Sequence, residues 1–124
     1  MSWPPRVGDP LPRAREAIGV RQKLLDYSLE VRHETGGPKA LGFARILGIT
    51  RGHVDYVEQS IRIGILRAPV YSIRQNPPFG INCVVEFPIQ GVGDKRMRTV
   101  NLRTTWIFVE ATSCPRMLTA FLRP

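Results

Sequence analysis

The chain has 124 residues, of which 43% are hydrophobic and 23% charged, a composition typical of one globular domain. Its formal net charge is +8, a balance that favours a polyanionic partner such as nucleic acid. The sequence shows no apolar run of membrane length and no signal-peptide pattern, so we expect a cytoplasmic protein that does not bind a membrane.

Arginine supplies most of the positive charge, because lysine occurs only at Lys23, Lys39 and Lys95. A guanidinium can hold a phosphate through two parallel hydrogen bonds, which an ammonium cannot do. Beyond residue 67 acidic residues are sparse, which argues against a two-carboxylate glycosidase or a magnesium nuclease. Cys83 and Cys114, together with the two histidines, show no ligand spacing, so we expect no metal and no cofactor.

The N-terminal half of the chain is predicted to be helical. Proline and glycine dominate residues 1–12, which we expect to form an extended lead-in to a single domain over residues 13–124. Apolar residues recurring at steps of three and four predict helices over residues 14–31, 38–47 and 51–65.

The C-terminal half is predicted to form strands. No helical pattern of ten residues separates them, so their sheet should be antiparallel. Helices followed by strands indicate an α+β fold, in which two to three N-terminal helices pack on one face of a four-stranded antiparallel sheet. The strand patterns cover residues 69–75, 80–89, 97–110 and 117–122.

Alternation along the third strand divides its side chains between two faces. We expect the face that includes Leu102 and Trp106 to pack under the helices. The other face carries Asn101, Arg103 and Thr105 side by side. A row of amide, guanidinium and hydroxyl groups can hold a phosphate and stabilise developing charge, although an ordinary solvated sheet face has the same appearance.

Two further residues are candidates for chemistry at an anion. His33 lies in a glycine-rich turn predicted over residues 32–37, and a histidine can act as a general base near neutral pH. Lys39 follows two glycines and a proline at the start of the second helix, where backbone N–H groups and an ammonium could bind an anion. The ordinary alternatives are an exposed loop histidine and a solvated helix end.

The aromatic residues fall into two predicted groups. Tyr27, Phe43 and Trp106 are expected in the core. The better candidates for stacking on a nucleobase are Tyr56, Tyr71 and Phe79.

Several short motifs, taken together, resemble a family. The chain is similar to a small bacterial domain of unknown function that occurs alone and at the C-termini of large secreted toxins, and the resemblance covers about residues 11–122. Through that family it is similar to the barnase-, EndoU-, colicin- and RelE-like toxins. The motifs are Lys23-Leu24-Leu25-Asp26-Tyr27, Gly36-Gly37-Pro38-Lys39-Ala40 with Phe43 and Leu47-Gly48, then Thr105-Trp106-Ile107, Pro115-Arg116 and Leu118-Thr119-Ala120.

The resemblance implies N-terminal helices on a four-stranded antiparallel sheet, a metal-independent ribonuclease acting on tRNA or mRNA, and an acidic immunity or antitoxin protein as partner. The family's usual aromatic-proline ending is altered here to Phe121-Leu122-Arg123-Pro124. The family's positions carried over to this chain are Lys23, Lys39, Thr105, Trp106, Arg116 and Thr119.

The leading hypothesis is therefore cleavage of RNA by attack of the ribose 2′-hydroxyl on the adjacent phosphate. The alternative is a non-catalytic basic module that binds RNA or an acidic protein. A structure in which His33 lies beyond the reach of Arg103 would favour this alternative. Transfer of ADP-ribose ranks last. The assigned roles are catalysis by His33, Lys39, Arg103, Thr105 and Thr119, and substrate binding by Lys23, Tyr71, Asn101 and Arg116.

Overall fold

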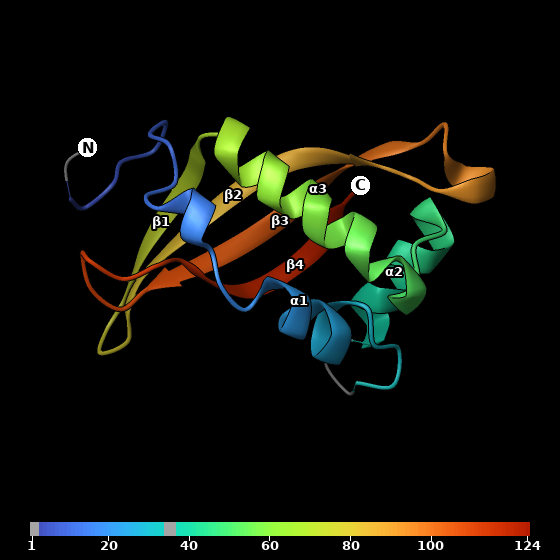
Figure 1. Cartoon of the computed structure of the whole chain (residues 1–124), viewed down its shortest axis with the longest axis horizontal. Coiled ribbons are helices and arrows are strands. Elements are labelled where there is room, and N and C mark those ends of the chain that lie inside the picture. The colour runs from blue at the N-terminus through green and yellow to red at the C-terminus, as the bar shows by residue number, and fades with distance from the viewer. Residues whose placement is uncertain (1–2, 34–36) are drawn as a thin grey trace.

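The computed structural model describes residues 3–33 and 37–124, and it has the predicted α+β architecture. Parts of the predicted lead-in and of the predicted glycine-rich turn, residues 1–2 and 34–36, lie outside the described residues. The sheet is an antiparallel meander in the order β1-β2-β3-β4, and the helices precede it in the chain (Figure 1). The elements are α1 (Val20–Lys23), α2 (Gly37–Leu47), α3 (Val54–Arg67), β1 (Val70–Asn76), β2 (Gly80–Gln90), β3 (Thr99–Phe108) and β4 (Arg116–Arg123).

The prediction of one continuous helix over residues 14–31 was wrong. A 3₁₀ turn, η1 (Ala14–Glu16), ends before Gly19, whose φ of 77° lies in the left-handed region that a helix cannot contain. Helical structure resumes in α1 and continues as a π-helical turn, η2 (Leu24–Ser28). The apolar periodicity continued through the break and concealed it.

The other predicted elements are confirmed, with small shifts at their ends. α3 extends two residues beyond the predicted helix and is preceded by a 3₁₀ turn, η3 (Arg51–His53). β3 is shorter than predicted, ending at Phe108 because Val109 is already exposed in the following loop. None of the helices within the described residues is long and apolar enough to cross a membrane.

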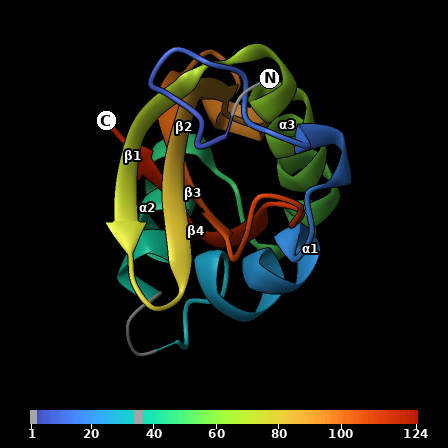
Figure 2. The ribbon, with the colours of Figure 1, turned by 90° about the vertical axis from the view of Figure 1, so that its left-hand side faces the viewer.

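The helices do not all cover the sheet in the same way. α1 and α3 lie on one side of the sheet (Figures 1 and 2). In Figure 1, α3 runs diagonally over the strands. α2 packs against β4 and η2 at the edge of the sheet rather than over its centre. Among the described helices, none lies over the middle of the opposite face of the sheet, which we call the open face.

The side chains of the core follow the predicted alternation. Leu102, Thr104, Trp106 and Phe108 are all fully buried, on the face of β3 opposite to Arg103. The hydroxyl of Thr104 donates to the carbonyl oxygen of Val85 at 2.8 Å and accepts from the indole Nε1 of Trp106 at 2.8 Å. This short chain of hydrogen bonds satisfies the buried hydroxyl of Thr104 and the indole N–H of Trp106.

The N-terminal segment packs on the start of the sheet. Gly8 N donates to Val70 O at 2.9 Å, and Val70 N donates to Asp9 O at 2.8 Å. Trp3 stacks edge-to-face on Phe108 with ring centroids 5.5 Å apart. These contacts hold residues 3–12 against β1 and the end of β3.

The two cysteines are free, and they differ in burial. Burial raises the pKa of the Cys83 thiol to about 11, whereas Cys114 is half-exposed. Because the thiolate is the reactive form, we expect a disulfide reagent to label Cys114 quickly and Cys83 only after unfolding. A Cys114→Ser variant should therefore be nearly inert in the native state, and rapid labelling of that variant would contradict the burial of Cys83.

The same shift affects stability at alkaline pH. A folded-state pKa above the unfolded value of 9.0 means that the contribution of Cys83 to stability is complete below pH 9. It is lost as pH rises toward about 11, because the unfolded chain ionises first. Denaturation of Cys83→Ala beside wild type should show a shallower loss of stability in the variant over this range.

Candidate functional site

A pocket of about 320 Å³ opens between the α1–η2 segment and the edge strand β4. This volume lies at the lower end of the range of small-ligand sites. The lining combines basic, aromatic and apolar side chains with a single carboxylate. The residues are Gly19, Gln22, Lys23, Asp26, Tyr27, His33, Arg116, Met117 and Leu118.

The break in the predicted first helix is what creates this pocket. Ile18 pairs with Arg116 as a parallel bridge, in which Ile18 N donates to Pro115 O at 2.9 Å and Met117 N donates to Ile18 O at 3.1 Å. The bridge fixes the start of α1 beside β4. The φ of 77° at Gly19 is what requires glycine in this turn, because a Cβ there would meet Cγ of Arg116 only at an ordinary contact distance of 3.5 Å.

The π-helical turn η2 carries two pocket residues, Asp26 and Tyr27. Single π-helical turns are rare and are found frequently at functional sites. The next residue, Ser28, is fully buried, and its hydroxyl has no hydrogen-bond partner among the described residues. A buried hydroxyl without a hydrogen-bond partner lowers the stability of the folded state.

Tyr27 is the centre of a basic cluster. Its ring lies 4.4 Å from the His33 ring, centroid to centroid, at an interplanar angle of 61°. The ammonium groups of Lys23 and Lys39 lie 5.8 Å and 5.9 Å from the same centroid, within cation–π range. Lys39 is also 4.6 Å from the Phe121 ring on β4. The prediction that Tyr27 belongs to the core was wrong, because its ring is half-exposed in the pocket wall.

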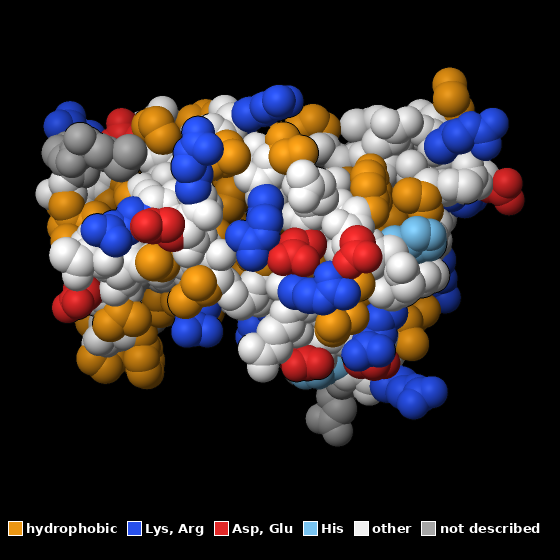
Figure 3. Space-filling view, viewed as in Figure 1, with side chains coloured by type: hydrophobic (Ala, Val, Ile, Leu, Met, Phe, Trp, Pro, Cys, Tyr) orange, Lys and Arg blue, Asp and Glu red, His pale blue; other side chains and the backbone are white. Residues whose placement is uncertain are grey.

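Among the carboxylates that the structure describes, none lies within salt-bridge distance of Lys23, Lys39 or Arg116. On the face covered by helices, by contrast, blue and red side chains alternate, as in the ion pairs from Arg21 to Asp55 and Glu58 (Figure 3). The pocket is thus a local excess of positive charge, which favours an anion.

The residues singled out from the sequence fall into two groups in space. Lys23, His33 and Arg116 line the pocket, and Lys39 lies beside it against Tyr27. The second group lies on the open face of the sheet and does not line the pocket. Its members are Tyr71, Asn101, Arg103, Thr105 and Thr119.

The open-face group is organised by strand register. Thr105 lies directly opposite Thr119, and Asn101 lies opposite Arg123. The guanidinium of Arg103 donates through Nε to Glu86 and sits 5.3 Å from the Tyr71 ring centroid. Arg103 is therefore held on the sheet by its neighbours rather than directed into the pocket.

Contacts nevertheless connect the two groups. His33 touches Tyr27, Tyr27 lies near Lys39, and Lys39 lies over Phe121, which faces Arg103 across the β3–β4 pair. Three side chains thus separate His33 from Arg103 along this path.

Two important residues did not emerge from the sequence as site residues. Glu86 is the hub of the open-face charges, and Tyr27 is the hub of the pocket. For Glu86 a signal was present, because it is the only charged residue of β2 and lies at an outward position of the alternating strand. For Tyr27 the sequence pattern carried no such signal, since its position continues the apolar stripe of the predicted helix.

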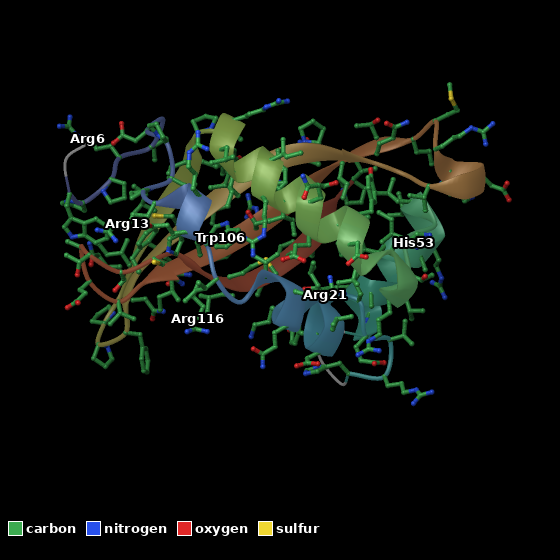
Figure 4. The ribbon with its side chains drawn as sticks, viewed as in Figure 1. Arg6, Arg13, Arg21, His53, Trp106 and Arg116 are labelled. Carbon is green, nitrogen blue, oxygen red and sulfur yellow. The ribbon has the colours of Figure 1, made fainter. Side chains whose placement is uncertain are left out.

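The second histidine has a structural role. His53 Nδ1 accepts a hydrogen bond from Thr50 N at 3.0 Å at the entrance to α3. Figure 4 shows His53 at the far end of α3 from Arg116, which lies along the lower edge of the sheet near α1. His53 is therefore outside the pocket. Within the described residues, no three His, Cys, Asp or Glu side chains are grouped so as to hold a metal ion.

Comparison with known proteins gives a family but no described activity. A family model described as Domain of unknown function (DUF6883) matches residues 10–124. No significant match was found among curated proteins or among solved structures.

Proposed function

The chain belongs to the family described as Domain of unknown function (DUF6883), and we propose that it is a metal-independent endoribonuclease whose active site is the pocket between η2 and β4. The observation that carries the proposal is the meeting of Lys23, His33 and Arg116 around one pocket. These are the residue types that phosphate binding and proton transfer need.

The proposed reaction uses the RNA's own hydroxyl as the nucleophile. His33 takes the proton of the ribose 2′-hydroxyl, and the oxygen attacks the adjacent phosphorus. The bond from phosphorus to the 5′-oxygen of the next nucleotide breaks, and that oxygen takes a proton from solvent. The products are a 2′,3′-cyclic phosphate and a free 5′-hydroxyl. Lys23 and Arg116 stabilise the negative charge that builds up on the phosphorane.

The proposed role of Lys39 is positioning. Its ammonium lies between the Tyr27 and Phe121 rings, so it raises the positive potential at the pocket entrance without lining the pocket itself. Arg103, Thr105 and Thr119 are assigned to the open face rather than to the reacting phosphate. An acidic immunity or antitoxin protein, as the toxin resemblance implies, would cover the same basic entrance.

A non-catalytic module that binds RNA or an acidic protein is the second candidate. One specific observation favours it: Arg103 is bound to Glu86 and is separated from His33 by three side chains, so it cannot assist a reaction at His33. Salt-sensitive binding without cleavage would identify this function.

The test is a cleavage assay on total bacterial RNA in excess chelator. We expect discrete fragments ending in a cyclic phosphate from wild type. We expect about 100-fold slower cleavage by Lys23→Ala, because a charge contact to the transition state is lost. Lys95→Ala, which changes the lysine in the β2–β3 turn, is the matched control and should cleave normally. Intact RNA with wild type, or equal rates in both variants, would overturn the proposal.

A further inference from the structure

The open face carries a row of side chains that runs across the strands toward the pocket. By register, Glu86 on β2 faces Arg103 on β3, and Arg103 faces Phe121 on β4. Tyr71 on β1 stands at one end of the row, against Arg103. Lys39 stands at the other end, against Phe121. With strands about 4.8 Å apart, the distance from β4 to β1 is about 14 Å, the reach of a short piece of extended nucleic acid.

The two guanidinium groups in this row are held in place by Glu86 and can still bind a phosphate. The Glu86 side chain is only 12% exposed, and its carboxylate accepts from both Arg103 and Arg123. One carboxylate thus orients two guanidinium groups, and a net positive charge is left. Each guanidinium has five N–H donors in a fixed plane, so donors remain for a phosphate after the bond to Glu86 is made.

An exposed aromatic ring completes the row. Tyr71 is 53% exposed, although its ring is fixed by the Arg103 guanidinium. A fixed and accessible ring next to an arginine is an effective platform for a nucleobase, which stacks on it whatever its sequence. Bases inside a duplex are already stacked on each other and cannot reach such a ring.

We infer that a single strand of RNA passes from the pocket across the open face and stacks a base on Tyr71, so that the protein selects unpaired RNA. This inference rests on the proposed function, since it extends the same substrate beyond the reacting phosphate. Lys39 lies where the strand leaves the pocket, Arg103 and Arg123 bind its backbone, and Tyr71 receives a base.

The inference is tested by binding, separately from cleavage. The probe is a fluorescein-labelled single-stranded oligonucleotide with 2′-deoxyribose throughout, which lacks the attacking hydroxyl and stays intact. Fluorescence anisotropy should show about tenfold weaker binding by Tyr71→Leu, the loss expected for one stacked base. Tyr56→Leu removes a tyrosine that is 36% exposed on α3, on the helix side, and should bind like wild type. The duplex form of the probe should compete at least about tenfold less well than the single strand.

Each result bears on one of the two proposals. Equal affinities of Tyr71→Leu and wild type, or equal competition by the duplex, would overturn the inference. If wild type still cleaves RNA in chelator, the proposed ribonuclease function stands even when the inference about Tyr71 is overturned. No binding of the single strand to wild type would also overturn the inference.

Discussion

Replacing His33 by alanine should slow RNA cleavage by a factor of about 10² to 10⁴, the usual contribution of a positioned general base. His33 lines the pocket, and its ring packs edge-on against Tyr27, which restricts the positions that it can take. Without the imidazole, the 2′-hydroxyl must lose its proton to water. Initial rates on a defined single-stranded RNA in excess chelator measure the effect.

The control for this variant is His53→Ala. His53 accepts from Thr50 N at the entrance to α3, so its removal should cost some stability and leave the cleavage rate nearly unchanged. The pH–rate profile gives a second readout, because the acid limb due to the general base should disappear in His33→Ala only. Similar rates for the two variants, with wild-type pH profiles, would show that His33 is not the base and would favour the binding module.

Replacing Trp106 by alanine should lower the free energy of unfolding by about 3–5 kcal/mol, the range for large aromatic residues in a core. The indole is fully buried, and Figure 4 shows it over the sheet, below and to the left of α3 in that view. Its Nε1 donates to Thr104, so the substitution removes both packing and the partner of that hydroxyl. Chemical denaturation followed by circular dichroism measures the loss.

Two companion variants separate packing from hydrogen bonding. Thr104→Val keeps the volume but leaves the Trp106 N–H without its acceptor, which should cost about 1–3 kcal/mol. Tyr71→Leu changes an exposed ring and should stay within about 0.5 kcal/mol of wild type. A loss below about 1 kcal/mol for Trp106→Ala would contradict the packing described for this core.

The sheet and its two faces were determined by the sequence alone. Strict alternation in β3 placed Leu102 and Trp106 in the core and Arg103 and Thr105 outside, because a strand turns successive side chains to opposite faces. The absence of helical patterns between the strands predicted the antiparallel meander that the structure contains. The two faces of a strand and the order of the strands follow from local backbone geometry, so the sequence of each segment is enough to predict them.

The pocket was decided by the tertiary structure. Only the bridge from Ile18 to Arg116, residues far apart in the chain, shows that the first predicted helix breaks at Gly19 and lies against β4. The same bridge brings Lys23 and Tyr27 to the pocket and turns an apparent core tyrosine into part of its wall.

The division of the candidate residues into two groups was likewise decided in space. Arg103 and Glu86 are 17 residues apart, and their pairing follows from the β2–β3 register, which also fixes Arg103 on the sheet rather than in the pocket. Periodicity specifies which way a side chain points from its own element. Which charges meet depends on long-range contacts that only the folded chain supplies.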